Sequence, residues 1–294
     1  MKRTVLFGGC MAVLCLSRAT TYYSVNSTAP NIAANWHINR NGTGASPANF
    51  SGTSDIFVVQ TGQTVTTTNN WTVAGTNGKI LIETGATLQG DHKVQSNYFE
   101  IQGTGKFVHN INNNTFPGVT STVLASTSTV EIQDWNTSSL PAGVTWGNLV
   151  INTAAIGASW NQSGVLTDVA GNLDVKNTGG GTNEFRLATT QGYTLNIGGD
   201  LVIEGGILEA GDNVGAYSHS IIIGGSYTQT GGTFTHSNTS FFYPLDLQFD
   251  GVSSAFTQSG GTLTSTYIDW TVNTGKKLTL NNNIPLGFLR SFIV

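Results

Sequence analysis

Charged side chains are scarce in this sequence, because Asp, Glu, Lys and Arg together make up only 10% of its 294 residues. Long amphipathic helices expose faces rich in Lys, Glu and Arg, so this composition argues against a mainly helical protein. Glycine is abundant instead, with 37 residues, and Thr and Asn recur throughout the chain. This mixture predicts many short strands joined by tight turns.

Cysteine is confined to an N-terminal leader. Lys2 and Arg3 precede an apolar run from Val5 to Leu16, and Ser17, Arg18 and Ala19 follow it. This order is typical of a signal peptide, residues 1–19, that is cleaved after Ala19. A transmembrane anchor is the alternative, but it would need about 20 apolar residues, and the run is shorter. We therefore expect a secreted protein with no membrane span after signal cleavage.

Loss of the leader also removes Cys10 and Cys15, the 2 cysteines of the chain. The mature protein then has no disulfide and no thiolate metal site. Three basic residues leave with the leader, so 9 of the 12 Lys and Arg residues remain against 16 Asp and Glu, a net charge of −7. Because no basic stripe remains to displace counterions, nucleic acid is not expected as a partner.

Internal repetition is the strongest pattern in the mature chain. Three stretches align with one another: Leu195–Ala210, Ile221–His236 and Leu247–Ser265. Their first residues follow at a constant interval of 26 positions, and glycine pairs separate short alternating apolar segments in the first two. A fixed period of this length predicts one turn of a β-solenoid. The predicted fold class is all-β, a right-handed parallel β-helix with coils of about 20–29 residues.

Alternation along each strand predicts which side chains face the core. Leu201, Tyr227 and Phe256 occupy equivalent inward positions in the three stretches. The same alternation places Gln229 and Gln258 inside, on adjacent coils. Buried amides need partners, so we expect these two side chains to bond with each other or with turn backbone.

The repeat divides the mature chain into two regions. Residues 166–294 form regular solenoid coils, whereas residues 20–165 form a looser N-terminal solenoid region in which similar strands recur about every 20 residues. Two polar, proline-containing segments, 110–122 and 137–144, are predicted loop excursions from the coils. The apolar C-terminal segment has no visible polar cap, so we expect a truncated solenoid whose last coil frays or associates with another chain.

Several segments resemble exported, adhesin-like β-helix proteins of Bacteroidota. They are Tyr22-Tyr23-Ser24, Asn35-Trp36, residues 55–60, and the repeats Tyr227–Thr235 and Phe256–Thr264. Members of that group usually carry a type IX secretion sorting domain, for which this sequence shows no counterpart. The resemblance implies a secreted or cell-surface protein whose partner is an extracellular glycan or a surface protein. The shared motifs are structural, so the resemblance assigns no functional residue.

Candidate binding residues are few. Aromatic side chains that could stack on sugars are Trp135, Trp146, Trp160 and Tyr217. Burial under loops or inside the coils is the favoured interpretation of these four side chains, because Trp is usually largely buried. Acidic side chains that could offer oxygens to calcium are Glu204, Glu209 and Asp212. The repeated glycine-aspartate motif of calcium-binding solenoids is absent from the sequence.

Catalytic patterns are missing as well. Glycosidases need two carboxyl groups about 5 to 9.5 Å apart, and no Asp or Glu pair occurs at positions i and i+2 of one strand. The positions one repeat of 26 residues after Asp200, Glu204 and Glu209 hold only serine or threonine. We therefore expect no second carboxylate to stack on these three side chains. The five histidines show no metal-ligand spacing. We therefore predict a non-enzymatic structural or adhesin-like protein without a cofactor, and a carbohydrate-binding or polysaccharide-degrading β-helix as the alternative.

Overall fold

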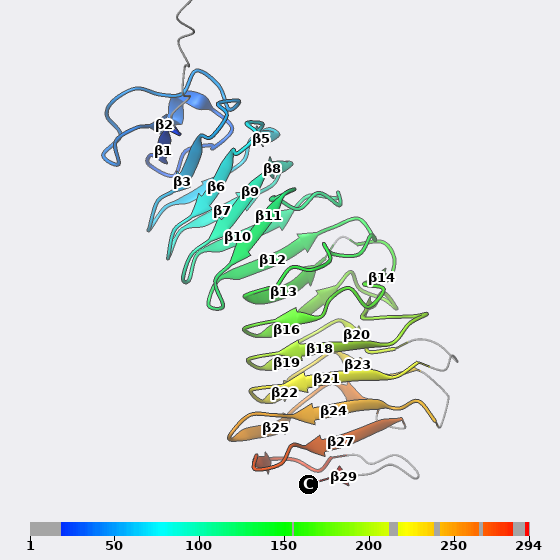
Figure 1. Cartoon of the computed structure of the whole chain (residues 1–294). Coiled ribbons are helices and arrows are strands. Elements are labelled where there is room, and N and C mark those ends of the chain that lie inside the picture. The colour runs from blue at the N-terminus through cyan, green and yellow to red at the C-terminus, as the bar shows by residue number, and fades with distance from the viewer. Residues whose placement is uncertain are drawn as a thin grey trace, which may run out of the picture.

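The computed structural model describes residues 19–154, 156–211, 217–237, 242–264, 267–284 and 292–293. The protein is all-β, and its parallel coils form a β-solenoid of about 9 turns, as predicted (Figure 1). The described helical structure is a single 3₁₀ turn at Ala33–Asn35. Within the described residues, no helix has the length and apolar character needed to span a membrane.

One ten-stranded sheet, here called the long sheet, runs through almost the whole solenoid. Its strands in chain order are β4 (Thr64–Thr66), β7 (Thr87–Gly90), β10 (Lys106–Asn110), β12 (Thr129–Asp134), β13 (Asn148–Thr153), β16 (Leu173–Thr178), β19 (Leu201–Ile203), β22 (Tyr227–Gln229), β25 (Ser254–Gln258) and β28 (Leu278–Leu280). Each described pair of neighbours in it is parallel, so every coil contributes its strand in the same direction.

Two six-stranded sheets follow one another along a second face. The N-terminal sheet contains β1 (Thr21–Ser24), β2 (Trp36–His37), β3 (Ile56–Val59), β6 (Lys79–Ile82), β9 (Tyr98–Ile101) and β11 (Ser121–Leu124). The C-terminal sheet contains β15 (Asp168–Val169), β18 (Tyr193–Ile197), β21 (His219–Ile223), β24 (Leu245–Phe249), β27 (Ile268–Val272) and β29 (Phe292–Ile293). The second face is therefore interrupted between β11 and β15, whereas the long sheet continues across that point.

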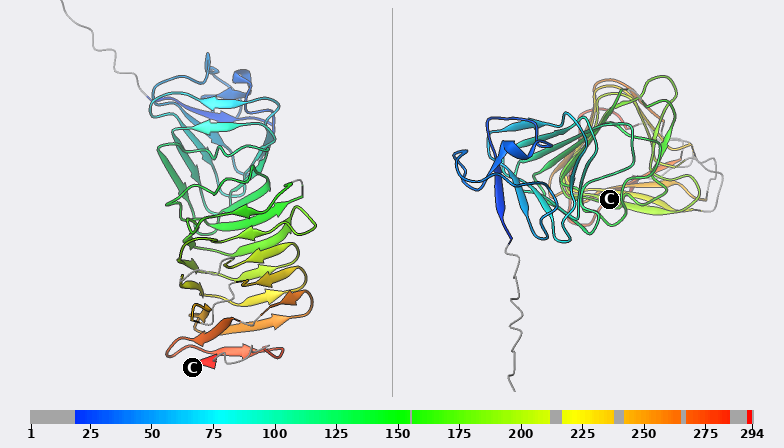
Figure 2. Two further views of the ribbon diagram at one scale, coloured as in Figure 1. Left: turned by 90° about the vertical axis from the view of Figure 1, so that its right-hand side faces the viewer. Right: turned by 90° about the horizontal axis from the view of Figure 1, so that it is seen from above.

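Shorter strands form a third face. The two-stranded sheet consists of β5 (Trp71–Val73) and β8 (Val94–Ser96). The five-stranded sheet consists of β14 (Trp160–Asn161), β17 (Phe185–Arg186), β20 (Ile207–Glu209), β23 (Thr233–Thr235) and β26 (Thr262–Leu263). Viewed from above, the N-terminal coils in blue lie to one side of the C-terminal coils, so the stack is not straight (Figure 2).

The predicted register is confirmed in the regular coils. Leu195 pairs with Ile221, and Ile221 pairs with Leu247. In the long sheet Tyr227 pairs with Leu201 on one side and with Phe256 on the other. These side chains are all 0% exposed, as alternation requires.

Coil length varies along the chain and stays close to the predicted range of about 20–29 residues. Ile80 pairs with Phe99, and Thr129 pairs with Asn148. Both intervals agree with the strand spacing of about 20 residues that is predicted for the N-terminal region. Hydrogen bonding follows the strands and not the turn glycines, because a turn can gain or lose a residue while the strands stay aligned.

Two of the predicted corner glycines have a clear steric requirement. Gly206 and Gly232 have φ values of +67° and +61°, in the left-handed region that favours glycine. A Cβ atom added to Gly232 would also lie 2.7 Å from backbone atoms of Gly205 and Gly206 on the preceding coil. These corners therefore need glycine both for conformation and for the close approach of successive coils.

The two glutamines of adjacent coils differ from each other. Gln229 is 0% exposed, and its Nε2 donates to the carbonyl oxygen of Thr262 at 3.0 Å while its Oε1 accepts from the Tyr227 hydroxyl at 2.8 Å. Gln258 pairs with Gln229 through the backbone but is only half-buried. The prediction is thus confirmed for Gln229 and wrong for a fully inward Gln258, because β28 pairs with β25 only as far as Phe256.

Residues 1–18 of the predicted leader lie outside the described residues. Most of the C-terminal segment from residue 285 onward lies outside them as well. Of that segment the structure describes β29, which pairs in parallel with β27. The predicted fraying of the last coil therefore stays a prediction.

Candidate binding site

A pocket of about 620 Å³ lies where the second face of the solenoid is interrupted. The two predicted loop excursions supply its walls. The lining residues on the first loop are Asn114, Thr115, Phe116, Pro117, Gly118, Val119, Thr120, Ser121 and Thr122; those on the second are Ser139, Pro141, Ala142, Gly143 and Val144. Two loops from successive coils thus form one hollow.

The first loop is anchored by one aromatic side chain and by backbone bonds. Phe116 is only 7% exposed and packs edge-on against Trp146, with ring centroids 5.2 Å apart. Gly118 and Val119 then donate their N–H groups to the carbonyl oxygen of Ser96 at 3.2 and 3.0 Å. The loop therefore has a fixed position over the core.

The second loop is held by two indole groups. Trp135 and Trp160 both donate their Nε1–H to the carbonyl oxygen of Ser138. The N–H of Leu140 donates to Oε1 of the buried Gln162 at 2.9 Å, and Leu140 itself packs in the core. These bonds satisfy both indole N–H groups and tie the second loop to the core.

The chemistry of the pocket is neutral. Its lining side chains carry hydroxyl, amide or apolar groups, and none of those named above is charged. Phe116 is the aromatic residue of the lining, and its packing on Trp146 leaves little of the ring exposed. The pocket therefore suits an uncharged ligand that forms hydrogen bonds and does not depend on a large stacking platform.

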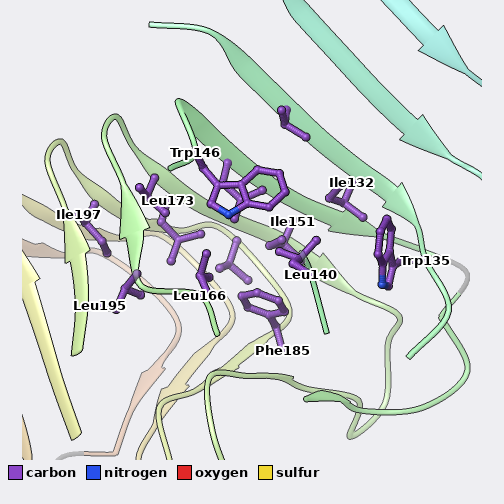
Figure 3. Close-up of a cluster of buried hydrophobic side chains, with 14 of the residues drawn as sticks. Ile132, Trp135, Leu140, Trp146, Ile151, Leu166, Leu173, Phe185, Leu195 and Ile197 are labelled. Atoms are coloured by element: carbon purple, nitrogen blue, oxygen red, sulfur yellow. The ribbon is translucent and has the colours of Figure 1, made fainter. Parts of the chain in front are cut away.

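The three candidate sugar-stacking tryptophans are core residues. Trp135 is 0% exposed, and Trp146 and Trp160 are each 1% exposed. Trp135 and Trp146 lie inside the coils beside Leu140 and Ile151 (Figure 3). No ring face is left for a sugar, so the sugar-stacking assignment does not hold for these three, and burial under the loops is the reason. Tyr217 is 36% exposed and stays a candidate.

The two described candidate calcium ligands, Glu204 and Glu209, differ in their surroundings. Glu204 is surface-exposed and lies 3.2 Å from Nζ of Lys176. Glu209 is fully buried, and Asp212 lies outside the described residues. In the part of the chain that the structure describes, no three acidic, histidine or cysteine side chains gather closely enough to hold a metal ion.

Glu209 instead belongs to a buried polar cluster that the sequence did not reveal. Nδ1 of His219 lies 3.0 Å from Nε2 of His236, so the two rings share one hydrogen bond. The Glu209 carboxylate accepts from the N–H groups of Gly211 at 2.8 Å and Ser237 at 3.0 Å, and from the Ser237 hydroxyl. Burial raises the pKa of Glu209 to about 7, whereas burial and the neighbouring His219 lower the pKa of His236 to about 4.

The regular repeat also did not predict a pair of aspartates on neighbouring strands. Asp246 of β24 is directly opposite Asp269 of β27. The Asp246 carboxylate accepts from Nε2 of Gln248 at 2.6 Å and from the Thr271 hydroxyl at 2.9 Å. The interval from Leu195 to Ile221 does not connect the two aspartates, because the coil between them is shorter.

We compared the chain with models of protein families, with curated proteins and with solved structures, and none of the three comparisons gave a significant match.

Proposed function

We propose that this protein is a secreted or cell-surface, non-enzymatic β-solenoid that acts as a rigid adhesin-like module. The single observation that carries this proposal is the pocket between residues 114–122 and 139–144. It is the place where two loops depart from a repetitive scaffold, and binding residues are typically found on loops that a rigid scaffold positions.

Rigidity supports the same role. The long sheet continues past the pocket through the pairing of β12 with β13, and the loops are tied to buried groups on both sides. A preorganised site loses little conformational entropy when a ligand binds, so modest contacts can give useful affinity. The partner that we propose is an extracellular surface molecule, either a glycan or a protein.

The test is an adhesion assay with the purified exported chain immobilised on beads. Ala142→Trp fills the pocket with a large side chain, and Val252→Trp is the matched control, because Val252 is 81% exposed and lies away from the pocket. We expect beads to adhere to glycan arrays or to cell-surface preparations, and Ala142→Trp to reduce adhesion by about tenfold while the control does not. Equal adhesion by both variants would refute the assignment of the pocket.

A polysaccharide-degrading enzyme is the second candidate, and the opposed Asp246 and Asp269 favour it. Neighbouring strands lie about 4.8 Å apart, so their carboxyl groups can approach the separation of about 5 Å that retaining glycosidases use. A depolymerisation screen tests this candidate. Turnover of a polysaccharide that Asp246→Asn and Asp269→Asn both abolish would establish it and would contradict the non-enzymatic proposal.

A further inference from the structure

Strand β11 is an edge strand in the middle of the solenoid. It is the last member of the N-terminal sheet, whose order is β11-β9-β6-β3-β1-β2 (Figure 1). On one side it pairs in parallel with β9, from Ser121 opposite Tyr98 to Leu124 opposite Ile101. The N–H of Ser121 donates to the carbonyl of Asn97 at 3.1 Å, and the N–H of Ala125 donates to Ile101 at 2.9 Å.

These bonds define which backbone groups of β11 are free. In a parallel ladder the groups of alternate residues point to the same side, so Ser121, Val123 and Ala125 face β9. The N–H and C=O groups of Thr122 and Leu124 therefore point to the opposite side. Within the described residues no strand pairs there, and no backbone bond to those groups occurs.

The reason for the free edge lies in the next coil. A Cβ atom added to Gly147 would lie 2.4 Å from the carbonyl oxygen of Ala125, so the segment that passes beside β11 in the next coil is the one that leads into Trp146 and includes Gly143 and Val144. Gly143 has φ +72°, which an extended strand does not allow, and Pro141 just before it has no N–H to donate, so no strand is found between β12 and Trp146. The second face resumes only at Trp146, which forms an isolated parallel bridge with Val169.

The space left by the missing strand is the pocket already described. Thr120, Ser121 and Thr122 line one side of it, and residues 139 and 141–144 line the other. Its volume of about 620 Å³ is within the range of ordinary ligand sites. Val119 and Val123 flank it and are 65% and 56% exposed, which leaves apolar surface beside the free backbone groups.

We propose that the edge of β11 binds an extended polypeptide segment of a partner protein by strand addition. This inference rests on the proposed binding role of the pocket and names the occupant. The partner's backbone pairs its N–H and C=O groups with the unpaired groups of β11, of which those of Thr122 line the pocket, in the mode known as β-augmentation. Its side chains are uncharged and small or β-branched, because the lining carries no charged residue and Val123 offers a β-branched neighbour.

A glycan fits these features less well than a peptide. Sugar sites usually offer a broad exposed aromatic face, and Phe116 is only 7% exposed. The unpaired groups are instead spaced as a strand repeat, which a polypeptide backbone matches residue by residue.

The test starts from a hexapeptide phage library panned against the full exported chain. Selected sequences are synthesised as acetylated amides, and their affinity is measured by fluorescence anisotropy. We expect the selected peptides to be uncharged. We also expect N-methylation of one alternate set of peptide amides, the set that faces β11, to weaken binding by about tenfold. Methylation of the intervening amides should leave the affinity unchanged.

Three variants of the protein complete the design. Thr122→Pro removes the free N–H without touching the bonds to β9, and we expect binding to weaken by about tenfold. Thr122→Val is the matched control: like the proline variant it loses the hydroxyl that donates to the carbonyl oxygens of Pro117 and Gly118, but it keeps the N–H, so it should bind clearly more tightly than Thr122→Pro. Ala142→Trp blocks the pocket from the opposite wall, so the test does not depend on the folding of Thr122→Pro.

The possible failures are distinguishable. Absence of selected peptides, or binding that is indifferent to N-methylation, overturns strand addition. Glycan adhesion that Ala142→Trp blocks, without peptide binding, overturns the inference but leaves the proposed function standing. Concentration-dependent self-association in light scattering that Ala142→Trp abolishes would identify a second copy as the occupant and would also overturn it.

Discussion

Replacement of Glu209 by glutamine should stabilise the protein at and above pH 7 and leave its stability unchanged near pH 4. The carboxylate is 0% exposed, and burial raises its pKa from the ordinary 4.5 to about 7. Glutamine has the same shape, and its carbonyl oxygen can accept from the N–H groups of Gly211 and Ser237 as the carboxylate does. Its NH₂ group then faces the Ser237 hydroxyl, which can accept a hydrogen bond.

The sign follows from proton linkage. Between pH 4.5 and about 7 the folded protein keeps the Glu209 proton while the unfolded chain releases it. The stabilisation is fully present below pH 4.5 and is lost as the pH rises through about 7. A rise of the pKa from 4.5 to about 7 corresponds to roughly 3 kcal/mol of unfolding free energy. The variant has no such loss, so its advantage grows from zero to about 3 kcal/mol across this window.

The wild-type curve alone would not reveal the effect. The pKa of His236 is lowered from 6.5 to about 4, so this group destabilises the protein as the pH falls through the same range. The two contributions oppose each other, and burial lowers the pKa of His219 as well, which adds to the contribution of His236. In the difference between Glu209→Gln and wild type the histidine contribution is common to both proteins and drops out.

The assay is urea unfolding of both proteins followed by tryptophan fluorescence, at intervals between pH 4 and pH 9. Hydrogen exchange of β20 and β23, which pair at Glu209 and Thr235, gives a local readout in the same coils. A difference in unfolding free energy that stays constant over the whole pH range would refute the reasoning. It would mean that Glu209 is ionised in the folded state at all of these values.

Three further predictions concern the core, a corner and the leader. Trp146→Ala should lower the unfolding free energy by about 3 to 5 kcal/mol, because it removes a buried indole, and a loss below about 1 kcal/mol in urea titration would contradict this. Gly232→Ala should lower the unfolding free energy clearly more than Gly180→Ala in the same titration. Both glycines have positive φ, but of the two only Gly232 has backbone atoms where an added Cβ would lie. Equal losses of unfolding free energy would argue against the close approach of the coils at Gly232. Intact-mass measurement of the exported protein should show Thr20 as the first residue, and retention of Lys2 would contradict the signal-peptide assignment.

The regular coils could be predicted from sequence because two independent patterns specify them. Alternation marks the inward residues of each strand, and the repeat aligns one strand with the next. Leu195, Ile221 and Leu247 satisfy both conditions, and their pairing is as expected. Gln258 satisfied both as well, yet it is half-buried, since burial also requires a following coil and β28 does not extend that far.

Contacts between coils of unequal length could not be predicted in this way. Asp246 pairs with Asp269 because the coil between them is shorter than the regular repeat. The interval of the regular repeat therefore does not predict this pair. His219 begins β21 and His236 directly follows β23, on another face, so no local spacing rule connects them. The two loops were predicted as excursions, but their convergence into one pocket depends on the short coil between β12 and β13.

The composition of β11 itself argues that its free edge has an occupant. Exposed strand edges promote unwanted pairing, and proteins usually protect them with charged residues, proline or a covering segment. The neighbouring strands β6 and β9 do carry charge, in the ion pair between Lys79 and Glu100. The strand at the edge, Ser121–Leu124, carries neither charge nor proline. An edge kept only to end the sheet would gain from a lysine at Val123, whose side chain is 56% exposed. An uncharged edge beside an uncharged pocket is instead what a strand-binding site requires. A lysine at this edge would exclude unwanted strands, but it would hinder the intended partner in the same way.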